Sequence, residues 1–392
     1  MIVIKFLWLA LQVLIGYNLI FPVILSIFYA LRNRSLDYKQ YKAYDYEVDY
    51  AIIVTAYEQT QQLPSVVNSL LKINYSNYLI YIVADKCDVS ELNFIDPRVI
   101  VLRPDQVLAS NTRSHFYAIN HFLRPHDRLT IIDSDNLTDP EYLLKLNFFF
   151  DQGYEAVQGV RAAKNLDTTY ACLDAARDIY YHYYDGKMLF GAGSSATLSG
   201  SGMAFKTALY IKCLQHLDIT GAGFDKVLQH AILSHDLRIA FAEDAIVYDE
   251  KTTGTDQLVN QRARWINTWF RYFTLGFGLV FKGIRNLSWN QFLFGLVLLR
   301  PPLFIFLILS VFFFCVNLFL SIPVALTWLA GLIVFVVGFL VALMRSSTDK
   351  VIYNSLKNIP AFMFYQVKSL IKAKWANQIS VATKHSYQEE NK

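Results

Sequence analysis

Two carboxylates one residue apart follow a short β-favouring segment, and together they suit a divalent cation. The segment covers residues 129–133, and the carboxylates belong to Asp133 and Asp135. A helix start is predicted at residues 139–141, with Asp139 as the N-cap and a proline in the first turn. The pair therefore lies in the loop after a strand, the edge where open α/β sheets bind ligands. Carboxylate oxygens there suit Mg²⁺ or Mn²⁺ carrying a phosphate, although a solvated turn has the same pattern.

Two other predicted strands also end in acidic residues. Residues 49–56 end before Glu58, and residues 79–84 end before Asp85 and Asp88. Helical segments alternate with these strands, which predicts a mainly parallel sheet. The carboxyl ends of its strands then share one edge, where clustered acids repel one another unless a cation or ligand is bound. The sequence therefore predicts a functional rim at this edge.

The hydrophobic fraction of the 392 residues is 54%, high for a soluble enzyme, and the excess is local. Residues 6–31 and 301–344 contain no charged side chain. The first segment is long enough for one membrane-spanning helix and the second for two, with a hairpin at residues 321–323. A signal peptide is the alternative for the first, but no clear cleavage motif precedes Arg32. Residues 45–255 have the pattern of a water-soluble α/β domain.

Basic residues indicate how the predicted spans are oriented. They follow the first span at Arg32, Arg34, Lys39 and Lys42, and the last span at Lys350, Lys357, Lys368, Lys372 and Lys374. The hairpin between the second and third spans has no charge. The positive-inside rule then predicts a multi-pass protein of the cell membrane, with the central domain and the C-terminal tail in the cytoplasm.

Charge and cysteine usage exclude some classes of protein. The net charge is only +4 and the basic residues are scattered, so nucleic acid is not expected as a partner. The four cysteines have neither metal-site nor disulfide spacing, and Cys315 falls within a predicted span. This pattern fits a reducing compartment.

A predicted helix at residues 256–273 contains the short pattern Gln261-x-x-Arg264-Trp265. Its aromatic residues recur at helical spacing beside arginines, at Trp265, Trp269, Phe270 and Phe273. Such a helix suits the membrane interface, with packing beneath the domain as the alternative. Residues 359–375 have a similar pattern of aromatic residues and lysines.

Taken in order, these residues resemble the membrane-bound family two glycosyltransferases of the GT-A fold. That group includes cellulose, hyaluronan and poly-N-acetylglucosamine synthases. The resemblance runs from about residue 51 to residue 265, and Gln261-x-x-Arg264-Trp265 is its most specific element. The other elements come in the expected order, namely Asp85, Asp133-Ser134-Asp135, a Gly/Ser loop at residues 199–202, Asp225, and Tyr248-Asp249-Glu250-Lys251.

The resemblance implies an α/β fold with a GT-A type nucleotide-sugar-binding domain, a mainly parallel sheet, about three transmembrane helices and interfacial amphipathic helices. The expected parts are an N-terminal transmembrane helix (residues 1–34), a cytoplasmic GT-A domain (45–255), an interfacial helix region (256–290), two transmembrane helices (291–345) and a cytoplasmic interfacial tail (346–392).

The resemblance also implies roles in binding the donor. In this family the matching residues bind the nucleotide sugar and a metal ion, Mg²⁺ or Mn²⁺. Ala56, Tyr57 and Glu58 would line the nucleotide pocket, Asp85 would contact the uracil, Asp133 would touch the nucleotide, and Asp135 would hold the metal that bridges the diphosphate.

The remaining family roles concern the transfer itself. Asp225 would be the general base on the acceptor hydroxyl, and Arg264, supported by Gln261, would neutralise the departing diphosphate. Trp265 would stack beside the acceptor sugar, and Gly202 would let the acceptor approach. Inverting transfer needs one base and positive charge on the leaving group, so these residue types are sufficient.

Two departures from the family pattern leave alternatives open. The family often has Thr-Glu-Asp where this chain has Gly223-Phe224-Asp225, and Glu243-Asp244 is a rival acidic pair after the next strand. The family also has a basic residue in the helix before the metal-binding strand. Arg113 or His115 could fill that place.

The leading hypothesis is an inverting, metal-dependent glycosyltransferase that moves a sugar from a UDP-sugar to a growing polysaccharide or glycan. Transfer of one sugar to a lipid is the alternative, because Gln-x-x-Arg-Trp occurs in both kinds of enzyme. A non-catalytic membrane scaffold is weaker, since the expected carboxylates are all present, and uncharged spans argue against a transporter. The expected partners are the donor, a glycan or lipid acceptor, the lipid bilayer, and partner subunits or a second copy of the chain.

Overall fold

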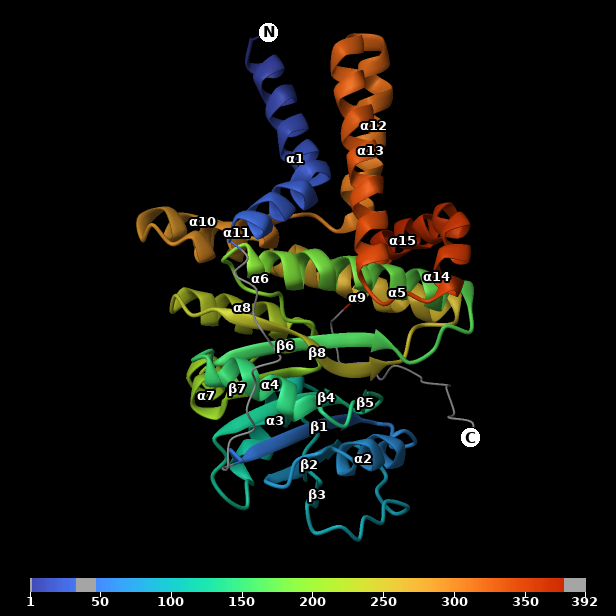
Figure 1. Cartoon of the computed structure of the whole chain (residues 1–392). Coiled ribbons are helices and arrows are strands. Elements are labelled where there is room, and N and C mark those ends of the chain that lie inside the picture. The colour runs from blue at the N-terminus through green and yellow to red at the C-terminus, as the bar shows by residue number, and fades with distance from the viewer. Residues whose placement is uncertain (1, 33–46, 377–392) are drawn as a thin grey trace.

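The computed structural model describes residues 2–32 and 47–376 and is arranged in three layers. A domain built on a β-sheet lies at one end, a layer of helices crosses above it, and three long helices rise away from that layer (Figure 1). The predicted basic flank at Arg34, Lys39 and Lys42 lies outside the described residues.

The domain contains an eight-stranded sheet in the order β3-β2-β1-β4-β7-β6-β8-β5. The strands are β1 (Tyr50–Tyr57), β2 (Tyr78–Asp85), β3 (Val99–Leu102), β4 (Arg128–Asp133), β5 (Leu137–Thr138), β6 (Ala156–Ala163), β7 (Met203–Lys206) and β8 (Ile239–Asp249). Strand β1 is parallel to β2 and β4, as β2 is to β3 and β6 to β8. The antiparallel pairs all involve β7 or β5, two short strands that the sequence analysis did not predict. The predicted α/β fold with a mainly parallel sheet is confirmed.

The strand register brings the predicted acidic strand ends to one edge. Tyr57 of β1 is aligned with Asp85 of β2, and Thr55 of β1 is aligned with Asp133 of β4. Since all three strands run parallel, their carboxyl ends lie side by side there. The rim predicted from the sequence is therefore present.

Short helices connect the strands of this domain. They are α2 (Leu63–Leu71), α3 (Asn111–Asn120), α4 (Tyr142–Asp151), α7 (Thr207–Leu214) and α8 (Phe224–Ser234). The predicted start of α4 is wrong by a few residues. Strand β5 precedes it, the N-cap is Glu141, and the Asp139 carboxylate instead accepts a hydrogen bond from the Glu141 N–H at 2.9 Å.

A layer of helices separates the sheet from the long helices (Figure 1). It contains α5 (Thr169–Tyr181), a π-helix η2 (His182–Met188), α6 (Leu189–Gly191), α9 (Thr255–Tyr272), α10 (Leu275–Arg285), α11 (Trp289–Leu299), α14 (Lys350–Ser355), a 3₁₀ turn η3 (Leu356–Asn358) and α15 (Ile359–Ala373). Helix α9 packs against α15, so the two helices expected at the membrane interface lie together.

Within residues 2–32 and 47–376, three helices are long and apolar enough to cross a membrane, as predicted. They are α1 (Ile2–Arg32), α12 (Leu303–Leu320) and α13 (Ile322–Arg345). The Gln12 side-chain oxygen of α1 accepts hydrogen bonds from Asn317 Nδ2 of α12 at 2.7 Å and Trp328 Nε1 of α13 at 2.8 Å. A continuous cluster of buried apolar side chains runs from the sheet into these helices, so the layers pack as one body.

Candidate active site

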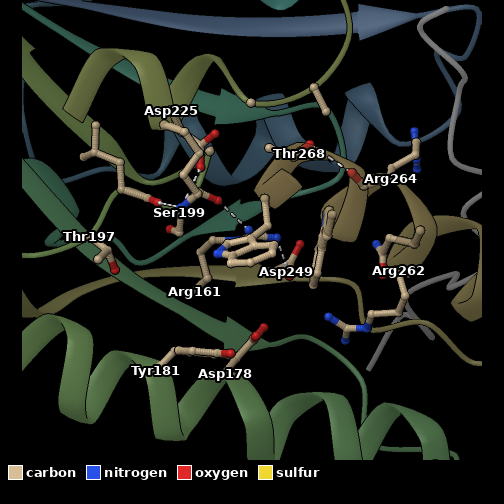
Figure 2. Close-up of a pocket in the computed structure, with 18 of the residues that line it drawn as sticks. Arg161, Asp178, Tyr181, Thr197, Ser199, Asp225, Asp249, Arg262, Arg264 and Thr268 are labelled. Carbon is tan, nitrogen blue, oxygen red and sulfur yellow. Dashed lines mark hydrogen bonds and ion pairs between the residues drawn. The ribbon is translucent and has the colours of Figure 1, made fainter. Parts of the chain in front are cut away.

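A cavity of about 600 Å³ begins at the sheet edge where β1 and β4 end. From there it passes between α8 and α9 and reaches the connection between α11 and α12. Seven of the residues predicted for the site line it, namely Tyr57, Asp133, Asp135, Asp225, Gln261, Arg264 and Trp265. Figure 2 shows that its walls carry many charged side chains, among them Arg161, Asp178, Asp225, Asp249, Arg262 and Arg264.

The loop after β4 is fixed to the Gly/Ser loop by one hydroxyl group. Ser201 Oγ accepts hydrogen bonds from the Asp133 N–H at 3.0 Å and from Asn136 Nδ2 at 3.0 Å. This fixes the loop that carries Asp133 and Asp135 at the cavity wall.

Among the described residues, no three His, Cys, Asp or Glu side chains form a metal site of their own. Two carboxylates suit a cation that takes its other ligands from a diphosphate and water.

Three of the residues predicted to bind the nucleotide lie beside the cavity and do not line it. Ala56 is buried within β1, and Glu58 forms an ion pair of 2.7 Å with Lys86 near the surface. The buried Asp85 carboxylate accepts hydrogen bonds from the backbone N–H groups of Leu108 at 3.0 Å and Ala109 at 2.7 Å. Asp85 therefore holds the backbone segment that leads into α3. Its predicted contact with the uracil ring of the nucleotide stays a prediction.

Asp225 lies in the first turn of α8, and its side chain points into the cavity (Figure 2). The preceding Gly223 has a φ of 108°, and a Cβ there would lie 2.6 Å from the Tyr272 ring and 2.7 Å from Thr268 of α9. Only glycine fits this close crossing of α8 and α9. The rival pair Glu243-Asp244 lies on β8 outside the cavity, where Glu243 forms an ion pair with Lys187.

Trp265 is held between two guanidinium groups on the cavity wall. The Arg177 guanidinium lies 4.4 Å from its ring centroid and that of Arg262 lies 4.2 Å away, so both make cation–π contacts. In Figure 2, Arg262 and Arg264 leave α9 in different directions. Burial lowers the pKa of Arg264 from its ordinary value. The Gln261 side-chain oxygen accepts a hydrogen bond of 2.9 Å from the Thr252 hydroxyl.

A set of buried and partly buried charges, to which the sequence analysis assigned no role, lies along the cavity wall and behind it. We call it the buried charge network, and it consists of Arg161, Asp174, Arg177, Asp178, Asp249, Lys251 and Arg262. Lys251 Nζ lies 2.6 Å from Asp178 and 2.7 Å from Asp249. Arg161 bonds Asp249 at 2.7 Å and the Ser199 carbonyl at 2.6 Å. The network therefore connects the Gly/Ser loop with the arginines that hold Trp265.

Electrostatics within the network favours the charged forms of most of these groups, whereas burial raises the pKa of Asp174 to about 6. Burial tends to lower the pKa of Arg161, but the carboxylates of Asp249 and Asp133 raise it above its ordinary value. The resemblance of residues 248–251 to a family pattern was the one signal in the sequence that pointed to part of this network.

The aromatic side chains of α9 do not form the membrane-facing stripe that the sequence suggested. Trp265, Trp269 and Phe273 line the cavity, and Phe270 is half exposed. The exposed apolar stripe lies on the next helix, α10, at Phe277, Phe281 and Ile284, and continues at Leu287 just after that helix. The reason is tertiary, because α9 packs against α15 and covers the cavity.

Three other expectations are changed by packing. Gly202 is buried away from the cavity, and a Cβ there would lie 2.9 Å from Val247, so glycine is needed for sheet packing. Arg113 forms an ion pair with Asp218 at 2.6 Å and does not line the cavity. Buried His115 bonds Tyr210 at 2.7 Å, and burial lowers its pKa to about 3. Asn111 of α3 lines the cavity instead.

Comparison with known families supports a glycosyltransferase. The sequence matches the family described as "Glycosyltransferase like family 2" over residues 48–268, more than half of the chain. The chain belongs to glycosyltransferase family 2. The matched region runs from the start of β1 to within α9, so it contains every strand of the glycosyltransferase sheet and most of the cavity.

One solved structure shows the same fold at low sequence identity, and a second is less similar. The mannosyltransferase PcManGT from Pyrobaculum calidifontis, in complex with GDP-Man and Mn²⁺, is 14% identical with a TM-score of 0.51, and the match covers 92% of this chain and 98% of that one. TarS residues 1–349 from S. aureus is 13% identical with a TM-score of 0.42, covering 83% and 89% of the two chains. A search of curated proteins gave no match.

Proposed function

We propose that this glycosyltransferase moves a sugar, with inversion, from a nucleotide sugar to an acceptor hydroxyl at the cytoplasmic face of the cell membrane. The observation that carries the proposal is that Asp133, Asp135, Asp225 and Trp265 line one cavity. These residues come from the end of β4, the start of α8 and the middle of α9, and they supply the parts that sugar transfer needs. A UDP-sugar is the first donor to test, because the resemblance implies it.

Asp135 is the proposed ligand of Mg²⁺ or Mn²⁺, and the neighbouring Asp133 is the proposed contact to the nucleotide. Two carboxylates at a strand end fit a cation that also binds a diphosphate, and PcManGT, which has the same fold, was solved with GDP-Man and Mn²⁺. The cation would neutralise charge on the departing diphosphate. Arg264 would add to this, because a guanidinium stays protonated even when half buried.

Asp225 is the proposed general base. It would take the proton of the acceptor hydroxyl while that oxygen attacks the anomeric carbon from the face opposite the leaving group. Trp265, held by cation–π contacts with Arg177 and Arg262, would lie beside the acceptor sugar. No second carboxylic acid is needed, in contrast to a glycosidase.

The test measures nucleotide release from a panel of UDP- and GDP-sugars with Mg²⁺ or Mn²⁺ and membrane lipids present. We expect one donor to be used, chelation to stop release, and Asp225→Asn to lower the rate by about 10²- to 10⁴-fold. Asp244→Asn is the matched control, because Asp244 is an exposed carboxylate outside the cavity.

Two results would contradict the proposal. Release that persists in Asp225→Asn at the wild-type rate would remove this residue as the base. A folded protein that releases nucleotide from no donor would contradict the transfer itself. The length of the product on a gel would separate a polymer from single-sugar transfer.

A further inference from the structure

The cavity does not end at Trp265, and its far part reaches the base of a predicted span. We call this part the membrane-side arm, and it is lined by Val297, Leu298, Arg300, Pro301, Pro302, Leu303 and Phe304. These residues form the end of α11, the connection, and the first turn of α12, which is one of the three candidate spans. The arm is thus continuous with the proposed catalytic end of the cavity.

The lining of the arm is mainly apolar. Arg300 pairs with Asp185, and the other six side chains are hydrocarbon. Ile266 and Trp269 of α9, with Phe273 directly after it, continue a largely apolar lining toward Trp265. A free polysaccharide chain gains little from such a lining, because its hydroxyl groups would lose water without gaining hydrogen bonds. A hydrocarbon chain gains affinity with each methylene that it buries.

The middle of the cavity, in contrast, contains polar atoms that lack partners. Asp185 of η2 lines the cavity and pairs with Arg300 through one carboxylate oxygen, while its buried Oδ1 has no hydrogen bond within the described chain. Nε and Nη1 of Arg262 are also buried and have no hydrogen bond within the described chain. Buried polar atoms without partners are rare, and a hydroxylated ligand would satisfy them. π-Helical turns such as η2 also recur at functional sites.

We propose that the acceptor is a lipid-linked sugar. Its hydroxylated headgroup would lie between Trp265 and Asp185, its hydrocarbon chain would occupy the membrane-side arm, and its reactive hydroxyl would face Asp225. This inference rests on the proposed function and names the acceptor class for it. An acceptor that enters from the bilayer fits the position of the arm at the base of α12.

The transfer step balances with this acceptor. The bond between the acceptor oxygen and the anomeric carbon forms as the bond from that carbon to the diphosphate oxygen breaks. The diphosphate leaves with the bonding electron pair, and the acceptor proton goes to the Asp225 carboxylate. No oxidant or further reactant is needed.

The test uses the full-length purified protein, the donor that supports nucleotide release, and alkyl glycosides kept below micelle formation. The acceptors are glucosides and N-acetylglucosaminides with chains of six, eight and ten carbons, beside the free sugars. We expect KM for the acceptor to fall with chain length by up to about fourfold per methylene, while kcat changes little. The product is one glycosylated lipid.

Two neighbouring residues of α11 provide a matched pair of variants. Leu298 and Leu299 are both half buried, but only Leu298 lines the cavity. We expect Leu298→Gln to flatten the dependence of KM on chain length and Leu299→Gln to keep the wild-type dependence. Because the readout is a ratio between acceptors, partial loss of folded protein does not change it.

Three results would overturn the inference. They are a KM that does not depend on chain length, an equal effect of the two variants, or free glycans that are elongated into polymers as well as the alkyl glycosides. In each case Asp225-dependent nucleotide release would remain, so the proposed function would stand. Absence of release from every donor would overturn both.

Discussion

At the scale of single residues, Lys251 shows how buried charge supports the site. Its side chain is 1% exposed and contacts two carboxylates, Asp178 and Asp249. Burial tends to lower the pKa of Lys251, but these carboxylates raise it above the ordinary value, so the ammonium group stays charged. Removing water from such charges is costly, and only good geometry offsets the cost. The network thereby fixes Ser199 and Trp265 rigidly, which is what a preorganised site requires.

Lys251→Met tests the contribution of this residue. We expect it to lower the free energy of unfolding by about 3–5 kcal/mol, because two buried carboxylates lose their common partner. Lys206→Met is the control, since Lys206 is exposed and pairs with Glu155 at 3.2 Å, and its loss is expected to stay below about 1 kcal/mol. Chemical denaturation in detergent measures both. Equal losses would show that the network does not stabilise the fold.

At the scale of elements, the crossing of α8 and α9 sets the position of the proposed base. The start of α8 is close to Thr268 and Tyr272 because residue 223 has no side chain. Asp225 and the Gln261-x-x-Arg264-Trp265 pattern are thereby brought to the same cavity from two helices. Neither helix forms the site alone.

Gly223→Ala tests this crossing. The added methyl group would clash with both side chains, and the φ of 108° disfavours alanine, so we expect a stability loss of about 1–3 kcal/mol and a lower kcat for nucleotide release. Gly254→Ala is the matched control, because residue 254 is exposed, has no positive φ and has open space around it. That variant should keep the wild-type kcat. A wild-type kcat in Gly223→Ala would mean that the crossing does not position Asp225.

At the scale of the whole molecule, the sheet domain packs against the long helices through a continuous core. One cluster of buried side chains extends from the sheet to α1, α12 and α13, and the helix layer lies between them (Figure 1). The cavity crosses this layer from the sheet edge to the first turn of α12. This arrangement would let the proposed nucleotide-sugar donor and the proposed lipid-linked acceptor reach Asp225 from different ends of the cavity.

The predicted topology can be tested by cysteine labelling in intact cells. In a Cys315→Ala background, whose remaining cysteines are buried, we expect Ser321→Cys between α12 and α13 to react with a membrane-impermeant maleimide. Ser347→Cys after α13 should react only once the cells are permeabilised. The opposite pattern would place the catalytic domain outside the cell. Labelling of both in intact cells would mean that α12 and α13 do not span.

The sequence alone predicted most of the fold, because strand and helix periodicity are local properties. It located β1, β2, β4 and the three long apolar helices within a few residues. It missed β5 and β7, which are two and four residues long and are defined only by pairing with distant strands. Short elements of this kind have too little local signal to predict.

The sequence by itself also determined the acidic strand ends at Asp133 and Asp135, the acidic start of α8 and the pattern that ends in Trp265, since residue type and spacing specify them. Only the tertiary structure decided which side chains face the cavity. Asp85 is turned to backbone N–H groups, Gly202 lies within the sheet, and the aromatic face of α9 points inward. The direction of a side chain depends on packing against segments that are far away in the chain. A local sequence pattern does not specify which segments those are.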